Sequence, residues 1–373
     1  MENRLSSNIG SKIFKNKLVA CSFTVLFVYL LTAIFAYLIA PDNSSDANEQ
    51  ISELALHPPG FSIKVLKIKK AETEKKENLS LILLRGSRKQ ESFIPIYQYS
   101  IVQDSIKIKH YKGINPFTKE SLKSNEEYYS KAYFSNEPNI SSKQPQIFTK
   151  SYPLGTDGYG RCILSRLIIG SRVSMTVGLL AVLISMSIGI LVGLLAGYLG
   201  GKVDDLLMLM INTIWSIPTL LLVFAIVLVM GRGIQIIYLA VGLTLWVDVA
   251  RIVRGQVLSA KENVYIDAAR SLGYGNIRIL AKHLLPNILG PIWVISMGNF
   301  ATAIILEAGL SYLGFGIQPP MPSWGNMLNE NYGYALSGNY LVAIFPALAI
   351  VILVLTVNII GNAFRDAYDV KIE

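Results

Sequence analysis

Residues that could carry out chemistry are scarce and widely spaced in this sequence. The three histidines, His57, His110 and His283, lie too far apart along the chain to predict a metal site or a nucleophile paired with a base. The dipeptide Gly201-Lys202 is followed by valine and lacks the upstream glycine of a phosphate-binding loop. We therefore expect no catalytic residue, no bound cofactor and no metal, and we do not expect the chain itself to be an enzyme.

A different kind of site is indicated by a polar, basic stretch, Lys261–Pro291, that lies between two strongly apolar segments. Its residue types predict a short helix over Glu262–Leu272, because good helix formers continue there without Gly or Pro. Gly273 then ends the helix, since a glycine just past the last turn readily adopts the left-handed conformation. A second helix is predicted over Ile277–Leu285, with Pro286 closing it. Two short helices joined at a glycine elbow are typical of a docking surface held between membrane helices.

The residues of this elbow resemble the characteristic cytoplasmic loop of ABC-importer permease subunits. The matching positions are Asp267, Ala268, Ala269, Gly273, Leu285 and Pro286. The ending His283–Asn287 is most similar to the oligopeptide/dipeptide permease family, although Asp267 stands where that family usually has glutamate. In the family, the first helix of the loop docks into a cleft on a cytoplasmic ATPase subunit. The resemblance implies that residues 261–290 couple this chain to such a subunit.

The resemblance also implies a set of partners. These are a second permease subunit in a heterodimer, two cytoplasmic ATPase subunits that bind ATP and Mg²⁺, and an extracytoplasmic substrate-binding protein. Di- or oligopeptides are the expected substrates, with nickel or another small solute as an alternative within the family. A self-contained secondary transporter or channel is the alternative from another class. Such a transporter would be expected to contain an inverted repeat, and we find no repeat in the sequence.

The elements that position the elbow are predicted from the composition. Of the 373 residues, 52% are apolar and only 16% are charged, and the apolar residues occur in long runs. Six windows reach the length of about 20 residues that a bilayer span requires. They are Leu18–Ala40, Ser171–Leu199, Leu206–Met230, Ile234–Arg254, Ile288–Leu313 and Tyr340–Phe364. With the resemblance, they predict an all-α polytopic membrane protein of the type I ABC importer permease fold.

The distribution of Lys and Arg predicts the orientation of these spans. Basic residues gather in the N-terminal lead and around the elbow, whereas residues 314–339 contain none. Because basic flanking segments stay in the cytoplasm, we expect both termini and the elbow to be cytoplasmic in a bacterial inner membrane. The net charge of +9 is then explained by residues beside the spans and by a lysine-rich insert, and we expect no nucleic-acid partner.

Three segments follow from this topology. Residues 1–40 form the cytoplasmic lead and first span, residues 41–151 an extracytoplasmic insert, and residues 152–373 a permease core of five spans. The coupling loop is placed at residues 256–288 of the core.

Apolar and polar residues alternate in parts of the insert. Strands are predicted over Phe61–Lys69, Phe93–Val102 and Ser105–Tyr111, so we expect the insert to be β-rich. Residues Lys112–Lys150 are predicted to be loop. The insert either contacts a binding protein or is a tolerated insertion without a role of its own.

Two further stretches, Tyr152–Gly178 and Leu310–Leu328, also resemble the peptide permease family. In the first, we expect a helix after Arg161 that lies at the outer membrane interface. In the second, we expect Trp324 to anchor an extended segment at the interface. Between them, Gly189, Gly193 and Gly197 form a stripe of small residues. Such a stripe favours close helix packing within the subunit, or alternatively a dimer face.

Polar or helix-breaking residues within the spans are candidates for the translocation path. Pro218 should bend the third span, either at the path or as a packing kink. Glu307 in the fifth span should face protein or water, because an unpaired carboxylate in lipid is costly. It is either close to the path, where it could attract a peptide amino group, or a hydrogen-bonded helix contact. Asp248 is expected to pair with Arg251, one helical turn away.

Overall fold

The computed structural model describes residues 16–68, 78–87, 92–102, 105–113, 122, 124, 126–130 and 147–369. The basic lead before residue 16 and most of the predicted loop 112–150 lie outside the described residues. The chain divides into two compact units that alternate along the sequence. The first unit comprises Met1–Leu31, Val173–Gln318 and Leu348–Glu373, and the second comprises Thr32–Arg172 and Pro319–Ala347. The predicted segments, by contrast, follow chain order.

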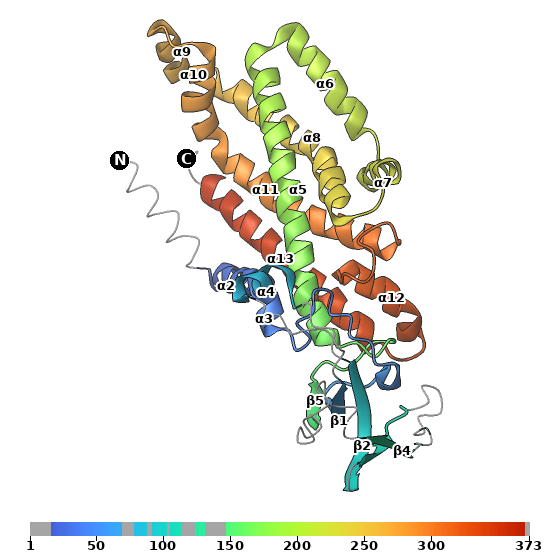
Figure 1. Ribbon diagram of the computed structural model, residues 1–373. Coiled ribbons are helices and arrows are strands. Elements are labelled where there is room, and N and C mark those ends of the chain that lie inside the picture. Colours follow the sequence, from blue (N-terminus) through green and yellow to red (C-terminus); the bar gives the residue numbers. More distant parts are fainter. Residues whose placement is uncertain are drawn as a thin grey trace. The chain divides into compact units, whose positions relative to one another are not determined.

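Within the described residues, five helical segments are long and apolar enough to cross a membrane, and a bent pair brings the number to six (Figure 1). The single segments are α2 (Lys17–Ile34), α5 (Ile163–Leu199), α8 (Ile234–Ala260), the run Asn276–Tyr312, and α13 (Leu341–Asp369). The bent pair is α6 (Gly201–Trp215) with α7 (Thr219–Met230). The prediction of a helical polytopic protein is confirmed.

The start of α5 differs from the prediction. The helix expected after Arg161 at the outer interface is instead the beginning of α5, which runs without a break for 37 residues. Ser165 and Arg166 are buried in its first turns, and Ile169 packs in a cluster with Tyr37. The amphipathic pattern therefore faces protein, and the position of this turn relative to the membrane surface stays a prediction.

The glycine stripe of α5 packs against α8 inside the first unit. A Cβ atom at Gly193 would lie 2.6 Å from the carbonyl oxygen of Ala250, and one at Gly189 would lie 2.5 Å from the Cβ of Val249. Gly197 is equally close to Val257, at 2.8 Å. Such distances allow no side chain, so glycine lets the two backbones approach closely. The stripe serves packing within the subunit, as the first of the two interpretations predicted.

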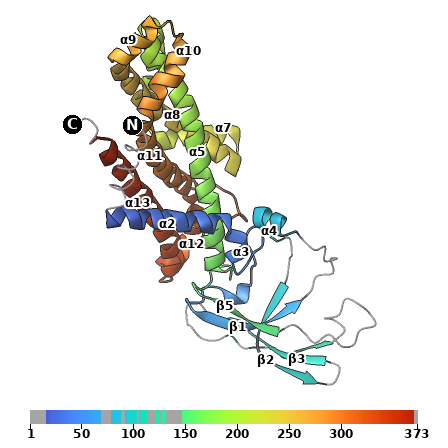
Figure 2. The ribbon, with the colours of Figure 1, turned by 90° about the vertical axis from the view of Figure 1, so that its left-hand side faces the viewer.

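The second unit contains a five-stranded antiparallel sheet in the order β4-β3-β2-β1-β5 (Figure 2). Its strands are β1 (Phe61–Ile68), β2 (Ser92–Val102), β3 (Ser105–His110), β4 (Glu126–Ser130) and β5 (Ile147–Tyr152). The first three confirm the strand predictions. The last two fall in or at the end of the stretch that was predicted to be loop, and there the prediction was wrong. Pairing with β1 and β3 forms them, which alternation within a short segment does not reveal.

Both faces of this sheet are packed. Val65 and Leu66 are neighbours in β1 and belong to different buried clusters, because successive side chains point to opposite faces. The first cluster includes Tyr152 and Cys162, and so joins the sheet to the residues just before α5. The unit also contains the short helices α3 (Ala36–Ile39), η1 (Ser52–Leu54) and α4 (Leu79–Arg85).

Trp324 begins α12 (Trp324–Leu336), a helix in the stretch that was predicted to be extended. Its side chain is only 1% exposed, and its indole Nε1 donates a hydrogen bond of 3.0 Å to the carbonyl oxygen of Leu167. The expected interface anchor is therefore a buried packing residue. The indole N–H is satisfied by protein, which permits burial.

Candidate functional site

The coupling loop contains a short amphipathic helix, α9 (Val264–Ser271). Ile266 and Ala269 are buried, whereas Asp267 and Ala268 are exposed. These positions follow from the three-residue spacing of Ile266 and Ala269, which puts both on one face of a helix. Of the predicted pair of alanines, only one is therefore available at the surface.

The elbow after α9 is a complete helix-ending motif. The amide of Tyr274 donates to the carbonyl of Ala269 at 3.1 Å, and the amide of Gly273 donates to the carbonyl of Arg270 at 2.9 Å. This pattern of crossed hydrogen bonds requires a left-handed residue, and Gly273 has φ of +78°. The prediction that Gly273 ends the helix is borne out by this geometry.

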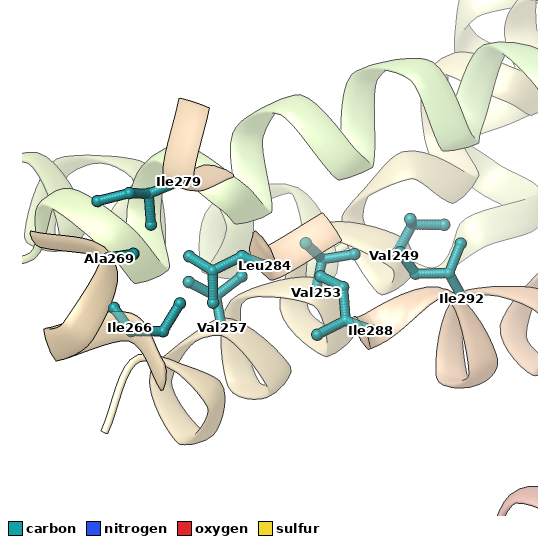
Figure 3. Close-up of a cluster of buried hydrophobic side chains, with 9 residues drawn as sticks. All are labelled: Val249, Val253, Val257, Ile266, Ala269, Ile279, Leu284, Ile288 and Ile292. Carbon is teal, nitrogen blue, oxygen red and sulfur yellow. The ribbon is translucent and has the colours of Figure 1, made fainter. Parts of the chain in front are cut away.

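The elbow is fixed to the membrane helices by one continuous hydrophobic core, which we call the coupling core (Figure 3). Its nine buried residues are Val249, Val253, Val257, Ile266, Ala269, Ile279, Leu284, Ile288 and Ile292. They come from α8, from the elbow and from the helical run that follows it. Because close-packed side chains compress little, α9 and the ends of both membrane helices form one packed body.

Polar contacts reinforce this attachment at the end of α5. The hydroxyl of Tyr198 donates to Oδ1 of Asn276 at 2.9 Å, and Nζ of Lys261 donates to the carbonyl of Gly197 at 3.0 Å. Three membrane helices, α5, α8 and the run after the elbow, thus hold the loop within the first unit.

The second predicted helix of the loop does not end at Pro286. Three segments, α10 (Asn276–Ile279), η3 (Leu280–Leu284) and α11 (Leu285–Tyr312), form one run. Pro286 stands in the first turn of α11, where its missing N–H is tolerated. The preceding η3 is a π-helical turn, a local widening that adjusts the hydrogen-bond ladder just before the proline. Leu285 is half-buried and Pro286 is exposed.

Apolar side chains also lie on the outside of the loop. Val264 is 83% exposed, Leu272 71% and Ile277 83%. These three exposed apolar side chains make the outside of the loop a candidate interaction surface. Sequence reasoning did not identify these three residues. One signal in the sequence could have identified them. They are apolar residues in a polar stretch, at positions outside the buried face of either predicted helix.

At Pro218 the third span is sharply broken. The axes of α6 and α7 differ by 89° across the break, and Pro218 itself is exposed. Ser216 and Ile217 close the end of α6 with backbone hydrogen bonds to Asn212 and Ile214. The predicted bend is thus present. A broken span exposes backbone groups, which are tolerated in a membrane only where protein or water covers them.

Polar and aromatic groups gather beside this break. Trp215 donates from Nε1 to Oδ1 of Asp248 at 3.1 Å, and the guanidinium of Arg251 lies 4.1 Å from the centre of the Trp215 ring. Arg251 also donates to Oδ1 of Asn212 at 2.9 Å. The expected pairing of Asp248 with Arg251 is replaced by these contacts. The reason is that α6 lies against α8 and brings Trp215 into contact with both charged residues.

Glu307 is fully buried within the first unit. One carboxylate oxygen accepts from Ser174 of α5 at 3.2 Å, and the other accepts from Ser311 one turn later at 2.8 Å. Ser311 in turn accepts from the amide of Ile317 at 3.2 Å. These contacts support the interpretation of Glu307 as a hydrogen-bonded contact between helices.

The chain resembles proteins of known families over its second half. A family model described as "Binding-protein-dependent transport system inner membrane component" matches residues 189–373. The dipeptide transport system permease protein of Bacillus subtilis is 41% identical over 218 residues, which cover 58% of this chain and 68% of that protein.

Two further relatives agree. The oligopeptide transport system permease protein of Bacillus subtilis is 36% identical over 60% of this chain and 73% of its own length. A glutathione transport system permease protein of Shigella flexneri is 43% identical over 59% of this chain and 72% of its own length. All three matches leave about two fifths of this chain uncovered.

Proposed function

We infer what this chain does from its family: it belongs to the inner membrane components of binding-protein-dependent transport systems, and is a permease subunit of an ABC importer. It is a multi-pass inner membrane protein, similar to dipeptide, oligopeptide and glutathione permeases. We propose that its substrates are di- or oligopeptides. The names of two relatives support this proposal, and the substrate retained by the associated binding protein would test it directly.

The proposed assembly pairs this chain with a second permease subunit, two cytoplasmic ATPase subunits and an extracytoplasmic binding protein. ATP and Mg²⁺ belong to the ATPase subunits in this proposal, because the present sequence offers no phosphate-binding loop. The elbow and both termini are placed in the cytoplasm, and the insert on the opposite side. The distribution of basic residues supports this orientation.

The observation that carries the coupling mechanism is the coupling core beneath an exposed apolar surface. In our proposal, α9 and the exposed Val264, Leu272 and Ile277 fit into a cleft of the ATPase. When ATP draws the ATPase subunits together, α9 moves with its cleft. The coupling core passes that movement to α8 and α11, so the spans rearrange. The ATPase contacts the loop differently in its ATP-bound and ATP-free states. The difference in binding energy can therefore shift the equilibrium between the two arrangements of the spans.

For the translocation path, we propose the break at Pro218 and the polar cluster beside it. Asp248 and Arg251 are charged residues within a membrane-spanning helix, and such residues almost always face a bundle interior or a water-filled cavity. Both are only partly buried within this subunit. A peptide, which carries amide and charged groups, would find matching donors and acceptors on this face. We assign the enclosed Glu307 to packing between helices, because it accepts hydrogen bonds from Ser174 and Ser311.

The decisive experiment replaces the exposed apolar face of the elbow. In the variant Val264→Glu/Leu272→Glu, we expect normal membrane insertion, together with loss of ATPase co-purification and of uptake. The physical reason is that two carboxylates would have to be desolvated in the cleft. Lys282→Gln, an exposed change in the same loop, is the control and should retain the ATPase. Normal ATPase binding and uptake in the double variant would refute the docking role.

A further inference from the structure

We propose that α4 (Leu79–Arg85) lies in the membrane interface and anchors the insert to the lipid surface. The helix has an outward face formed by Leu81 and Leu84, which are 51% and 61% exposed. Ile82 and Leu83, on the opposite face, are partly buried. Exposed leucines on a short helix of a polar module are costly in water and favourable at the boundary of a bilayer.

The position of α4 along the membrane normal follows from its contacts. It packs on α3 (Ala36–Ile39), which continues the first membrane helix after a break at Phe35. Directly after α4, the amide of Ser87 donates to the carbonyl of Asn43 at 2.8 Å. Asn43 lies in the first polar segment after that helix. The end of α4 is therefore level with the point at which the chain leaves the bilayer.

Gly86 allows the end of α4 to pack closely against the polar segment that contains Ser45. Its φ is +74°, and a Cβ atom there would lie 2.8 Å from the Cα of Ser45. A left-handed glycine that allows such an approach fixes the direction in which α4 leaves the polar segment. The outward face of the helix is thus set by the fold.

Arg172 of α5 donates hydrogen bonds to carbonyl groups at the C-terminal end of α4. Without a donor, these carbonyls would be unfavourable near lipid. Arg172 donates from Nη1 to the carbonyl of Leu83 at 2.7 Å, and from Nη2 to the carbonyl of Leu84 at 3.1 Å. Unsatisfied carbonyls at a helix end are unfavourable in an apolar environment. A cation at the C-terminus of a helix also interacts favourably with the helix dipole. With its carbonyls satisfied, α4 can approach the acyl chains.

Continuity with the membrane helix identifies the occupant of this face as lipid. On α3, which packs directly against α4, Leu38 and Ile39 are also exposed, at 47% and 52%. The lipid that surrounds the first membrane helix therefore extends to the leucines of α4. Residues 79–84 carry no charge, and the one charged residue of α4 is the exposed Arg85 at its end. The inference requires only that α2 and α3 enter the membrane, and it does not depend on the transported substrate.

The test places single nitroxide spin labels on α4 in the complete transporter. Leu81→Cys and Leu84→Cys are made in a Cys21→Ser background, since Cys21 is exposed and Cys162 is buried. The complex is reconstituted in nanodiscs of phosphatidylcholine and phosphatidylglycerol. Collision of each label with oxygen, which concentrates in lipid, is compared with collision with a water-soluble nickel chelate. Gln98→Cys, on the exposed part of β2, serves as the control.

We expect the ratio of oxygen to nickel-chelate collisions to be severalfold higher at Leu81 and Leu84 than at Gln98. A ratio at both sites equal to that at Gln98 would overturn the proposal, because the face would then be in water. Protection from both reagents would also overturn it, since protein would then cover the face.

A second measurement avoids a bulky label. Photo-leucine incorporated at position 84 should yield a lipid adduct on illumination, identified by mass spectrometry. A peptide adduct in place of lipid would assign the face to a protein partner and refute the lipid anchor.

Discussion

At the scale of residues, Gly273 and Gly275 lie close together in the sequence but have different backbone requirements. Gly273 has φ of +78°, whereas Gly275 has φ of −69° and an extended conformation that any residue adopts. At neither position would an added Cβ meet an atom within 4 Å, so both have room for a side chain. The two glycines therefore differ only in their backbone conformation.

We therefore predict that Gly273→Ala destabilises the elbow by about 1–2 kcal/mol, the cost of a left-handed non-glycine residue. Amides of α9 should then exchange with deuterium about 5–30 times faster, which is the corresponding change in the opening equilibrium. Gly275→Ala should leave exchange unchanged. Equal exchange in the two variants would show that the helix-ending motif is not what holds the elbow.

His57 is a buried titratable group of the insert, and its backbone amide donates to Oγ1 of Thr156, before α5, at 2.9 Å. Its Nδ1 donates to the carbonyl of Ala55 at 3.1 Å, and its Nε2 accepts from the hydroxyl of Tyr111. Burial lowers the pKa of His57, and the hydrogen bond with Ala55 opposes that shift in part. Burial also raises the pKa of Tyr111 to about 12, so its hydroxyl remains a donor at neutral pH.

Because its pKa is lower in the folded state than in the unfolded state, neutral His57 stabilises the fold above the unfolded value of about 6.5. That contribution is lost as the pH falls below 6.5 toward the folded pKa, since the unfolded chain then binds the proton more tightly. We predict faster deuterium exchange in β1 at pH 5.5 than at pH 7.5, after correction for intrinsic rates. His57→Gln should reduce this dependence, and an unchanged dependence would assign it to other groups.

The coupling loop illustrates what residue-level reasoning from sequence can reach. The residues that matter were identified from their types, and Gly273 has the conformation expected of it. Which alanine lies inside was not evident, because Ala268 and Ala269 are chemically identical. Their environments differ only through the packing of α9 on Val257 and Leu284, which are distant in sequence.

At the scale of elements, the sequence predicted where the long helices occur but did not predict the residues at which they begin and end. Long apolar runs predicted the spans, because a bilayer requires them. The starts of α5 and α11 precede those windows, and the ends of α8 and α13 extend beyond theirs through polar residues. Pro286 was expected to end a helix, yet a π-helical turn before it and its place in a first turn allow the run to continue. The strands β4 and β5 depend on pairing with distant segments, and α4 on packing against α3.

The packing of α5 on α8 gives a prediction at this scale. Gly193→Ala places a methyl group 2.6 Å from a backbone oxygen, so the helices must separate. We expect a loss of about 1–3 kcal/mol, typical of overpacking, and a lower unfolding temperature in detergent. Gly298→Ala in α11 is the matched control, because an added Cβ there meets nothing within 4 Å. An equal loss in both variants would indicate a general effect of replacing helical glycines.

At the scale of the whole molecule, the compact units could not be read from the sequence. Each unit assembles segments separated by more than a hundred residues, such as Thr32–Arg172 with Pro319–Ala347. Long-range pairing of this kind leaves no local pattern. The long apolar helices and the first three strands of the insert were nevertheless predictable, because each depends on a local pattern of apolar residues.

The coupling core gives the last prediction, since all nine of its residues belong to the first unit. Most of the insert can therefore be removed without disturbing it. β1 and β5 are adjacent antiparallel strands in which Leu66 pairs with Ile147. Replacing residues 67–146 by Asn-Gly would join them through a two-residue turn of the type that favours hairpins. This shortened chain retains Leu54, His57 and Tyr152.

We predict that the shortened permease still inserts into the membrane and co-purifies with its ATPase subunits at wild-type stoichiometry. The physical reason is that the gripping surface and its support are untouched by the deletion. The measurement is affinity purification from membranes, with ATPase subunits quantified per permease, and Val264→Glu/Leu272→Glu in the shortened chain as the negative control. Loss of the ATPase from the shortened permease alone would mean that the insert takes part in holding the coupling loop, and the separation of the two roles would fail.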